Sequence, residues 1–124
     1  MTCQTIDSTP ACMTWRIYAG DTQPEVLEFI ADGVPWDMTG CTLSAEARET
    51  VSSETVALTA TCEEVSARIG QWRIVWPGDE ARTVLAGAKS WQGVYDVQVT
   101  QPGGAVVTVI RGTLTVMMDV TRGT

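Results

Sequence analysis

Residues 91–120 have the sequence WQGVYDVQVTQPGGAVVTVIRGTLTVMMDV and contain the clearest structural signal in the chain. Apolar and polar side chains alternate over 91–100 and again over much of 105–120. A period of two is typical of strands with one buried face. The intervening Gln-Pro-Gly-Gly at 101–104 favours a tight turn, so we predict a β-hairpin. We expect Gly112 to mark a bulge that divides the second run into two strands.

Runs of the same period occur upstream, bounded by turn-forming Gly, Pro or Asp residues. One segment, 79–86, instead predicts a single short helical turn, capped by Asp79 and ended by Gly87. Together with the hairpin this gives about seven strands. Because each strand has one apolar face to bury, we predict an all-β fold, an Ig-like antiparallel β-sandwich. The upstream strands are expected at 13–18, 25–30, 42–48, 55–61 and 71–76.

The length of the chain, 124 residues, suits one domain. We expect residues 13–124 to form the β-sandwich and residues 1–12, which lack strand periodicity, to form a flexible N-terminal arm. The apolar content of 44% is too high for a disordered chain. No apolar run is long enough to cross a bilayer, and the N-terminus lacks the regions of a signal peptide. We therefore expect a soluble protein made in the cytoplasm.

Charge and composition argue against several functions. Fifteen acidic and eight basic residues give a formal net charge of −7, which disfavours binding to nucleic acid or to anionic membranes. Histidine is absent, which removes Ser-His-Asp and Cys-His nucleophilic arrangements. The sequence also lacks a nucleophile elbow and a phosphate-binding fingerprint. We therefore expect no enzymatic activity, no catalytic residues and no cofactor.

The four cysteines, Cys3, Cys12, Cys41 and Cys62, include no closely spaced pair of the kind found in zinc knuckles or redox motifs. The leading interpretation is reduced thiols, some of them buried. A Cys3–Cys12 disulfide that pins the N-terminal segment comes second, and a four-cysteine zinc site comes third.

Four aspartates, Asp21, Asp32, Asp37 and Asp119, lie near predicted turns. Their carboxylates are of the type that binds calcium, but their spacing is not that of an EF-hand loop. Aspartate is common in turns because its side chain bonds local backbone amides. We interpret these residues as turn formers and expect no bound metal.

Several segments share their order and spacing with a known family. They are Gly20-Asp21-Thr22, DGVPWDMTG at 32–40, GVYDVQV at 93–99, VTVIRGTLTV at 107–116 and DVTR at 119–122. In this order they resemble the N-terminal β-sandwich domain of phage baseplate upper proteins and related small phage virion structural proteins. Met38 stands where the family usually has leucine. The resemblance spans residues 13–122 and implies an Ig-like sandwich, a role in virion assembly and no enzymatic activity.

Baseplate upper proteins continue into a receptor platform that residues 1–124 do not include, so receptor binding is not carried over. The resemblance favours a structural protein of a tailed-phage virion, located in the tail, baseplate or fibre-attachment region. Its partners would be other phage structural proteins and copies of itself, in a homo-oligomer within the particle. A capsid decoration or head-fibre protein is the nearby alternative. A carbohydrate-binding module that uses Trp36 and Trp91 is the alternative from another class.

Four residues are candidates for contacts between subunits. Trp36 and Trp91 flank turns, and indoles are enriched at interfaces. Arg111 lies within an apolar strand, either as an edge charge that blocks aggregation or as half of an ion pair across an interface. Arg122 follows the last strand and is expected to be exposed to a neighbour. The other three tryptophans share strand faces with apolar residues, so we predict that they are core: Trp15, Trp72 and Trp76.

Overall fold

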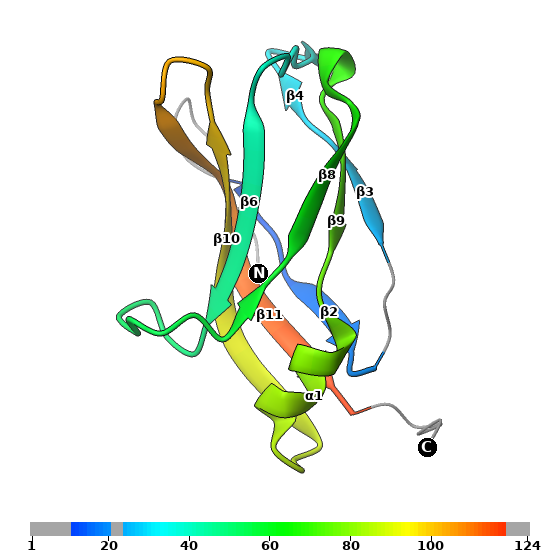
Figure 1. Ribbon diagram of the computed structural model, residues 1–124, viewed down its shortest axis with the longest axis vertical. Coiled ribbons are helices and arrows are strands. Elements are labelled where there is room, and N and C mark those ends of the chain that lie inside the picture. Colours follow the sequence, from blue (N-terminus) through cyan, green and yellow to red (C-terminus); the bar gives the residue numbers. More distant parts are fainter. Residues whose placement is uncertain (1–10, 21–23, 119–124) are drawn as a thin grey trace.

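The computed structural model describes residues 11–20 and 24–118, and their fold is an all-β sandwich (Figure 1). Strands make up 54% of these residues, with one α-helix and one short 3-10 helix beside them. Two sheets face each other with the core between them, as the strand periodicity predicts.

No helix in the described part of the chain has both the length and the apolar character needed to span a membrane.

The larger sheet has the strand order β1-β11-β10-β6-β7, and β2 also pairs with β11. β10 pairs antiparallel with β11 along its whole length, which confirms the predicted hairpin, and with β6 on its other side. β1 and β2 instead run parallel to β11, a departure from the antiparallel arrangement expected. The strands of this sheet are β1 (Ala11–Cys12), β2 (Trp15–Tyr18), β6 (Thr42–Arg48), β7 (Leu58–Thr59), β10 (Ser90–Thr100) and β11 (Val106–Met117).

The smaller sheet has the order β3-β9-β8 and is antiparallel throughout. The sequence predicts β3 and β9 to within two residues but places one strand at 55–61, where β7 covers only two residues and β8 begins at Thr61. The next strand, β8, was missed because its sequence TCEEVS has two adjacent glutamates in place of a clear alternation. The strands of this sheet are β3 (Glu25–Glu28), β8 (Thr61–Ser66) and β9 (Gln71–Val75).

A small antiparallel hairpin of β4 and β5 lies at one end of the sandwich, next to the 3-10 helix η1 (Figure 1). Its turn residues are Asp32 with φ 53° and Gly33 with φ 80°, so Asp32 forms a turn as the sequence predicts. The following loop turns inward, where the backbone N–H of Met38 donates to the carbonyl of Ala67 at 2.7 Å. The Met38 side chain is fully buried there. The bounds are β4 (Ile30–Ala31), β5 (Val34–Pro35) and η1 (Ala67–Ile69).

The helix α1 (Gly78–Leu85) lies at the opposite end of the sandwich and matches the predicted helical turn at 79–86 to within one residue. Its N-cap is Pro77, so Asp79 lies in the first turn instead of at the cap. A carboxylate in the first turn is still favourable because it faces the positive end of the helix dipole. Ala86 and Gly87 have φ of 49° and 87°, and this left-handed backbone ends the helix.

An aromatic cluster occupies the centre of the core. Trp15, Trp76 and Tyr95 contact one another edge to face, with ring centroids 5.6 to 6.0 Å apart. Trp72, on β9, is also buried, so the prediction that Trp15, Trp72 and Trp76 are core is confirmed. The Tyr95 hydroxyl donates a hydrogen bond of 2.7 Å to the carbonyl oxygen of Met13.

Gly112 does not mark a bulge, in contrast to the prediction. It lies directly opposite Tyr95 in the β10–β11 ladder, and the register shift occurs instead between Val97 and Gln98 of β10. A Cβ atom at position 112 would overlap the backbone carbonyl of Met13, in the link between β1 and β2. Glycine is therefore required here by the close approach of another backbone segment.

The cysteines correct a second expectation. Cys12 is disulfide-bonded, so the leading interpretation of reduced thiols is wrong for this residue; Cys3 lies outside the described residues. Cys41 and Cys62 have free thiols and are half-buried against the core. Burial raises the pKa of the Cys62 thiol to about 11. Ala11 and Cys12, which we assigned to the flexible arm, form β1; residues 1–10 lie outside the described residues.

Candidate functional site

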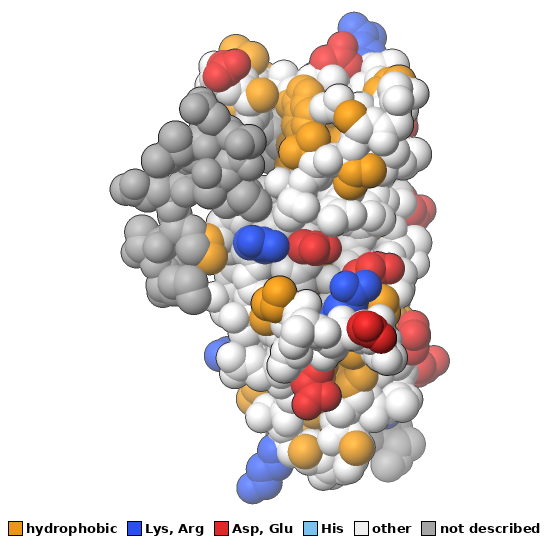
Figure 2. All heavy atoms as spheres, turned by 90° about the vertical axis from the view of Figure 1, so that its left-hand side faces the viewer, with side chains coloured by type: hydrophobic (Ala, Val, Ile, Leu, Met, Phe, Trp, Pro, Cys, Tyr) orange, Lys and Arg blue, Asp and Glu red, His pale blue; other side chains and the backbone are white. Residues whose placement is uncertain are grey.

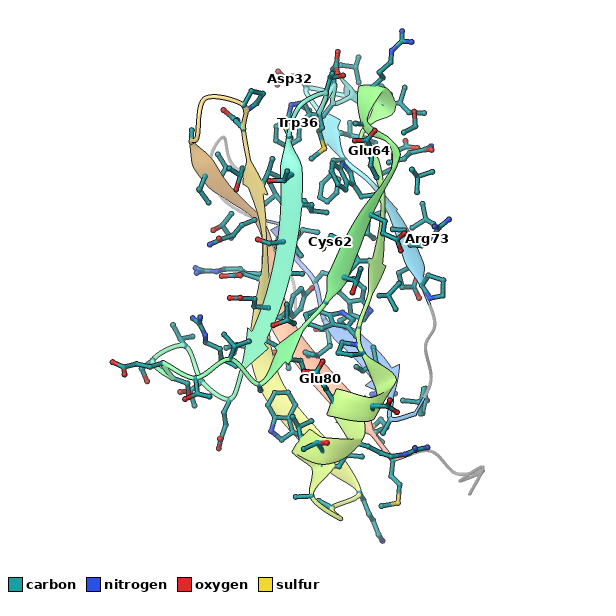
Figure 3. The ribbon with its side chains drawn as sticks, in the orientation of Figure 1. Asp32, Trp36, Cys62, Glu64, Arg73 and Glu80 are labelled. Carbon is teal, nitrogen blue, oxygen red and sulfur yellow. The ribbon has the colours of Figure 1, made fainter. Side chains whose placement is uncertain are left out.

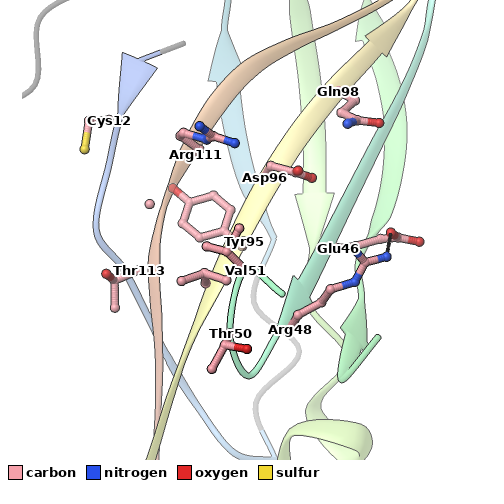
Figure 4. A pocket seen from close by; sticks show the side chains of 12 residues that line it. Cys12, Glu46, Arg48, Thr50, Val51, Tyr95, Asp96, Gln98, Arg111 and Thr113 are labelled. Atoms are coloured by element: carbon pink, nitrogen blue, oxygen red, sulfur yellow. Dashed lines mark hydrogen bonds and ion pairs between the residues drawn. The ribbon is translucent and has the colours of Figure 1, made fainter. Parts of the chain in front are cut away.

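The outer face of the larger sheet carries the candidate site. Side chains that alternate with the core residues of β6, β10 and β11 point away from the smaller sheet, and they line a hollow of about 480 Å³ (Figure 4). Figure 2 shows this face of the molecule, with acidic and basic side chains lying across its middle. The site is therefore an open surface built on regular strands.

A row of charged residues crosses this face at one height. Glu46 on β6 is the direct cross-strand partner of Asp96 on β10, and Asp96 is the direct partner of Arg111 on β11. Cys12 on β1 continues the row beyond Arg111. Direct partners on a sheet have Cβ atoms about 5 Å apart, so the register alone brings these four side chains together.

The two central strands each have a single charged residue. Asp96 is the only charge among the eleven residues of β10, and Arg111 is the only charge among the twelve of β11. The strand register places these two charges side by side on the outer face, as Figure 4 shows. Arg111 is exposed and Asp96 is half-buried.

A second pair of charges lies along β6. Arg48 and Glu46 are two positions apart, so both point outward, and the Arg48 Nη2 to Glu46 Oε1 distance is 3.4 Å. Their side chains are 39% and 44% exposed, so this ion pair contributes little to the stability of the fold. The Nε of Arg48 is buried and has no hydrogen-bond partner in the structure. The guanidinium thus has hydrogen-bonding capacity to spare.

The loop after β6 forms one wall of the hollow. It contains a tight turn in which the backbone N–H of Ser53 donates to the carbonyl of Thr50 at 3.1 Å, and the two hydroxyls bond at 2.9 Å. Val51, in this turn, is 79% exposed. The turn therefore holds an apolar side chain outward beside the charged row.

The chemistry available on this face is charge and hydrogen bonding. Guanidinium groups stay charged throughout the physiological pH range, and carboxylates accept from several donors at once. Beneath them, burial raises the pKa of Tyr95 above its usual range and so keeps its phenol protonated. Such a face suits the recognition of another polar or charged surface.

The two candidate tryptophans lie far apart. Trp36 is at the end of the sandwich that carries the β4–β5 hairpin (Figure 3), whereas Trp91 is the second residue of β10, close to the α1 end. Both are half-buried and pack against the core. The ring of Trp91 lies over Gly93, on the inner side of its strand, where a Cβ would overlap it. The two indoles therefore cannot form one sugar-binding platform.

The remaining candidates divide between the described and undescribed parts of the chain. Arg111 lies in the charged row, as a candidate for an ion pair. β11 has β1 on one side and β10 on the other at Arg111, so the alternative that Arg111 is an edge-strand charge is wrong. Arg122 lies outside the described residues.

Two of the four turn aspartates are described, and both have the predicted local role. Asp32 forms the β4–β5 turn. The Asp37 carboxylate accepts hydrogen bonds from the Thr39 hydroxyl at 2.6 Å and from the Thr39 backbone N–H at 3.1 Å, and these bonds lower the pKa of Asp37. Asp21 and Asp119 lie outside the described residues. Within the described residues, no three His, Cys, Asp or Glu side chains are close enough together to hold a metal ion.

Sequence reasoning singled out Arg111 but not its neighbours Glu46, Arg48 and Asp96. The alternation over 42–48 and 91–100 did indicate that these three side chains share the polar faces of their strands. What the alternation cannot supply is the strand order and register, which bring them into one row.

No protein-family model matches this sequence, and no curated protein is significantly similar to it.

Proposed function

We propose that this chain is a non-enzymatic structural module of a tailed-phage particle, in the tail, baseplate or fibre-attachment region. Its role would be to hold neighbouring protein subunits. The proposal is carried by the series of family-like segments quoted above. The parts of these segments that the structure describes lie mainly in β10, in β11 and around the β4–β5 hairpin.

Segments 93–99 and 107–116 are the paired centres of β10 and β11, the two longest strands. Segment 32–40 contains the turn of the β4–β5 hairpin and the loop in which Met38 is buried. These segments lie in the central strand pair and in the hairpin at one end of the sandwich. Their order and spacing are therefore evidence about the fold, and they do not identify a binding site. The assembly role itself comes from the family analogy.

The geometry of the outer face supports a role in holding subunits. Its charged residues lie on regular strands whose backbones the sheet already orders. Binding of a partner therefore costs little backbone conformational entropy. Contacts of this kind are individually modest, but symmetric repetition in a particle lets many of them act together. The face is therefore better suited to a rigid macromolecular partner than to a small substrate.

The strand edges of the smaller sheet are less suited to contacts. β8 carries Glu63 and Glu64, and β3 carries Glu25 and Glu28, with no strand paired beyond either one in the described residues. Charged side chains on edge strands oppose pairing with another chain. This favours association through sheet faces over the addition of strands at these edges.

The experiment is to follow the chain into phage particles. Particles from the phage that encodes the chain are purified on a density gradient, and the chain is quantified against the major capsid protein by mass spectrometry. The expected result is a fixed ratio that survives high salt and repeated purification. An antibody label or a density map would then locate the chain.

Three results are distinguishable. Density at the tail or baseplate supports the proposal as stated. Density on the capsid would replace it with the decoration or head-fibre alternative. Absence from particles, with abundant chain in the same infected-cell lysate, would overturn the assembly role.

A further inference from the structure

We infer that two copies of this chain associate face to face through the outer surface of β6, β10 and β11, with reciprocal ion pairs between Arg111 of each copy and Asp96 of the other. The inference deepens the proposed function by naming one partner and its surface. Its test is the association of the purified chain, so it can fail while the particle experiment succeeds, and the reverse.

The register makes this face self-complementary. Asp96 and Arg111 are direct cross-strand partners and both point outward. A two-fold axis that lies in the interface, parallel to β10 and β11 and midway between them, exchanges the two strands without changing height along them. Each Arg111 is then brought opposite Asp96 of the second copy, and a two-fold contact supplies the pair twice.

Both charges are available for such a contact. Within the described residues the one ion pair shorter than 4 Å is Arg48–Glu46, so Arg111 and Asp96 are neighbours without being paired at that distance. Since each is the only charge on its strand, neither has an alternative partner along its own strand.

The charge balance of the chain also favours this face. The formal net charge of −7 makes two copies repel each other at most orientations. Around the hollow, however, Glu46 and Asp96 are balanced by Arg48 and Arg111. Apart from Arg48, the side chains next to the charged row on β6, β10 and β11 are uncharged and of moderate size: Ser44, Val94, Gln98, Thr108 and Thr113.

The smaller sheet offers a competing face, and it is the weaker candidate. Glu63 on β8 and Arg73 on β9 are also direct partners of opposite charge. Their strands have only six and five residues, against eleven and twelve for β10 and β11. Glu28 adds a further negative charge on the neighbouring strand β3, directly opposite Gln71. This face is therefore smaller and net negative, and it supplies a matched control.

The test uses two single variants, Arg111→Asp and Asp96→Arg. Each places like charges opposite each other twice in a homodimer, and we expect each to raise the dissociation constant about a hundredfold, tenfold for each repelling contact. An equimolar mixture of the two variants restores both attractive pairs in a heterodimer. The mixture should therefore associate about as tightly as the wild type, although each variant alone associates about a hundredfold more weakly.

The measurement is sedimentation velocity of the full chain, between about 1 μM and 1 mM, the range of weak to moderate association. The monomer has a mass of 13.4 kDa, and a dimer has twice this mass. Arg73→Glu is the matched control and should leave the dissociation constant unchanged. Far-ultraviolet circular dichroism and thermal melting establish that each variant is folded. A variant that fails to fold is replaced by Arg111→Thr, which removes the attraction without adding repulsion and should weaken association about tenfold.

Recovery of the dimer only in the mixed variants supports the inference, because a folding defect cannot be repaired by adding a second defective chain. A wild type that stays monomeric at the highest concentration overturns it. Dissociation by Arg73→Glu, with Arg111→Asp still dimeric, would transfer the interface to the smaller sheet and also overturn it.

Discussion

Replacing Gly112 by alanine tests how the N-terminal strands are held against β11. Gly112 lies within a regular strand and does not have a positive φ, so general experience predicts that alanine stabilises the fold by about 0.5–1 kcal/mol. The structure predicts the opposite sign, because the new Cβ would overlap the carbonyl of Met13.

The magnitude follows from what the displaced carbonyl holds. Moving Met13 breaks the hydrogen bond from Tyr95 and the bond of 3.2 Å from the Met13 N–H to the carbonyl of Arg111, each contributing about 1 kcal/mol. The Tyr95 hydroxyl is then left buried without a partner, which adds about 1–3 kcal/mol. After the gain in strand propensity is subtracted, the net loss is about 3 kcal/mol, or about 10 °C in melting temperature for a domain of this size.

The assay is urea unfolding followed by tryptophan fluorescence, which reports directly on the cluster around Trp15 and Trp76. Gly103→Ala is the matched control: Gly103 lies in the hairpin loop with open space around it and without a positive φ, so alanine there should be neutral or slightly stabilising. If Gly112→Ala is as stable as the wild type, the close approach of Met13 does not constrain this position and the reasoning is refuted.

Three further predictions concern titrating groups. Burial raises the pKa of Tyr95, so the folded state keeps a proton that the unfolded state releases near pH 10. The free energy of unfolding should therefore be constant below about pH 10 and fall above it. In urea titrations, Tyr95→Phe should flatten this fall, and it should cost about 1 kcal/mol at neutral pH because the hydrogen bond to Met13 is lost. Thr39→Ala should return the lowered pKa of Asp37 toward its ordinary value, measured by the pH dependence of its carboxyl carbon in NMR spectra; an unchanged midpoint would contradict the assignment. The Cys62 thiol has a pKa of about 11, so only about one thiol in a thousand is ionised at pH 8, and iodoacetamide should alkylate it slowly there and faster toward pH 11. Rapid alkylation at pH 8 would show that burial does not protect this thiol.

The two-residue periodicity was enough to predict the long, regular strands, and the short turn between two of them also predicted their pairing. Residues 42–48 form a strand with the predicted bounds, and 91–100 does so to within one residue. The hairpin turn at 101–104 joins the strands on either side of it, so one local signal was enough for two strands and their pairing. The buried tryptophans were predictable for the same reason, since each shares a face with apolar residues.

The failures occurred where distant segments decide the outcome. β1 and β2 have two and four residues, too few for a period to specify a partner, and their partner β11 lies at the other end of the described chain. Gly112 looked like a bulge because the residue that demands it, Met13, is remote in sequence. The charged row has the same origin: Arg111 was visible as an isolated charge, but its relation to Asp96 and Glu46 depends on the strand order.

The pairing of β1 and β2 with β11 has a consequence for how the molecule folds. Cys12 pairs with Arg111, 99 positions later, so this step closes almost the whole chain into a loop and has the largest entropic penalty of any pairing in the sandwich. The β10–β11 hairpin needs only a short loop and can form early. Docking of residues 11–18 should then be the slow event, and until it happens one side of β11 stays open to adventitious pairing with other unfinished chains.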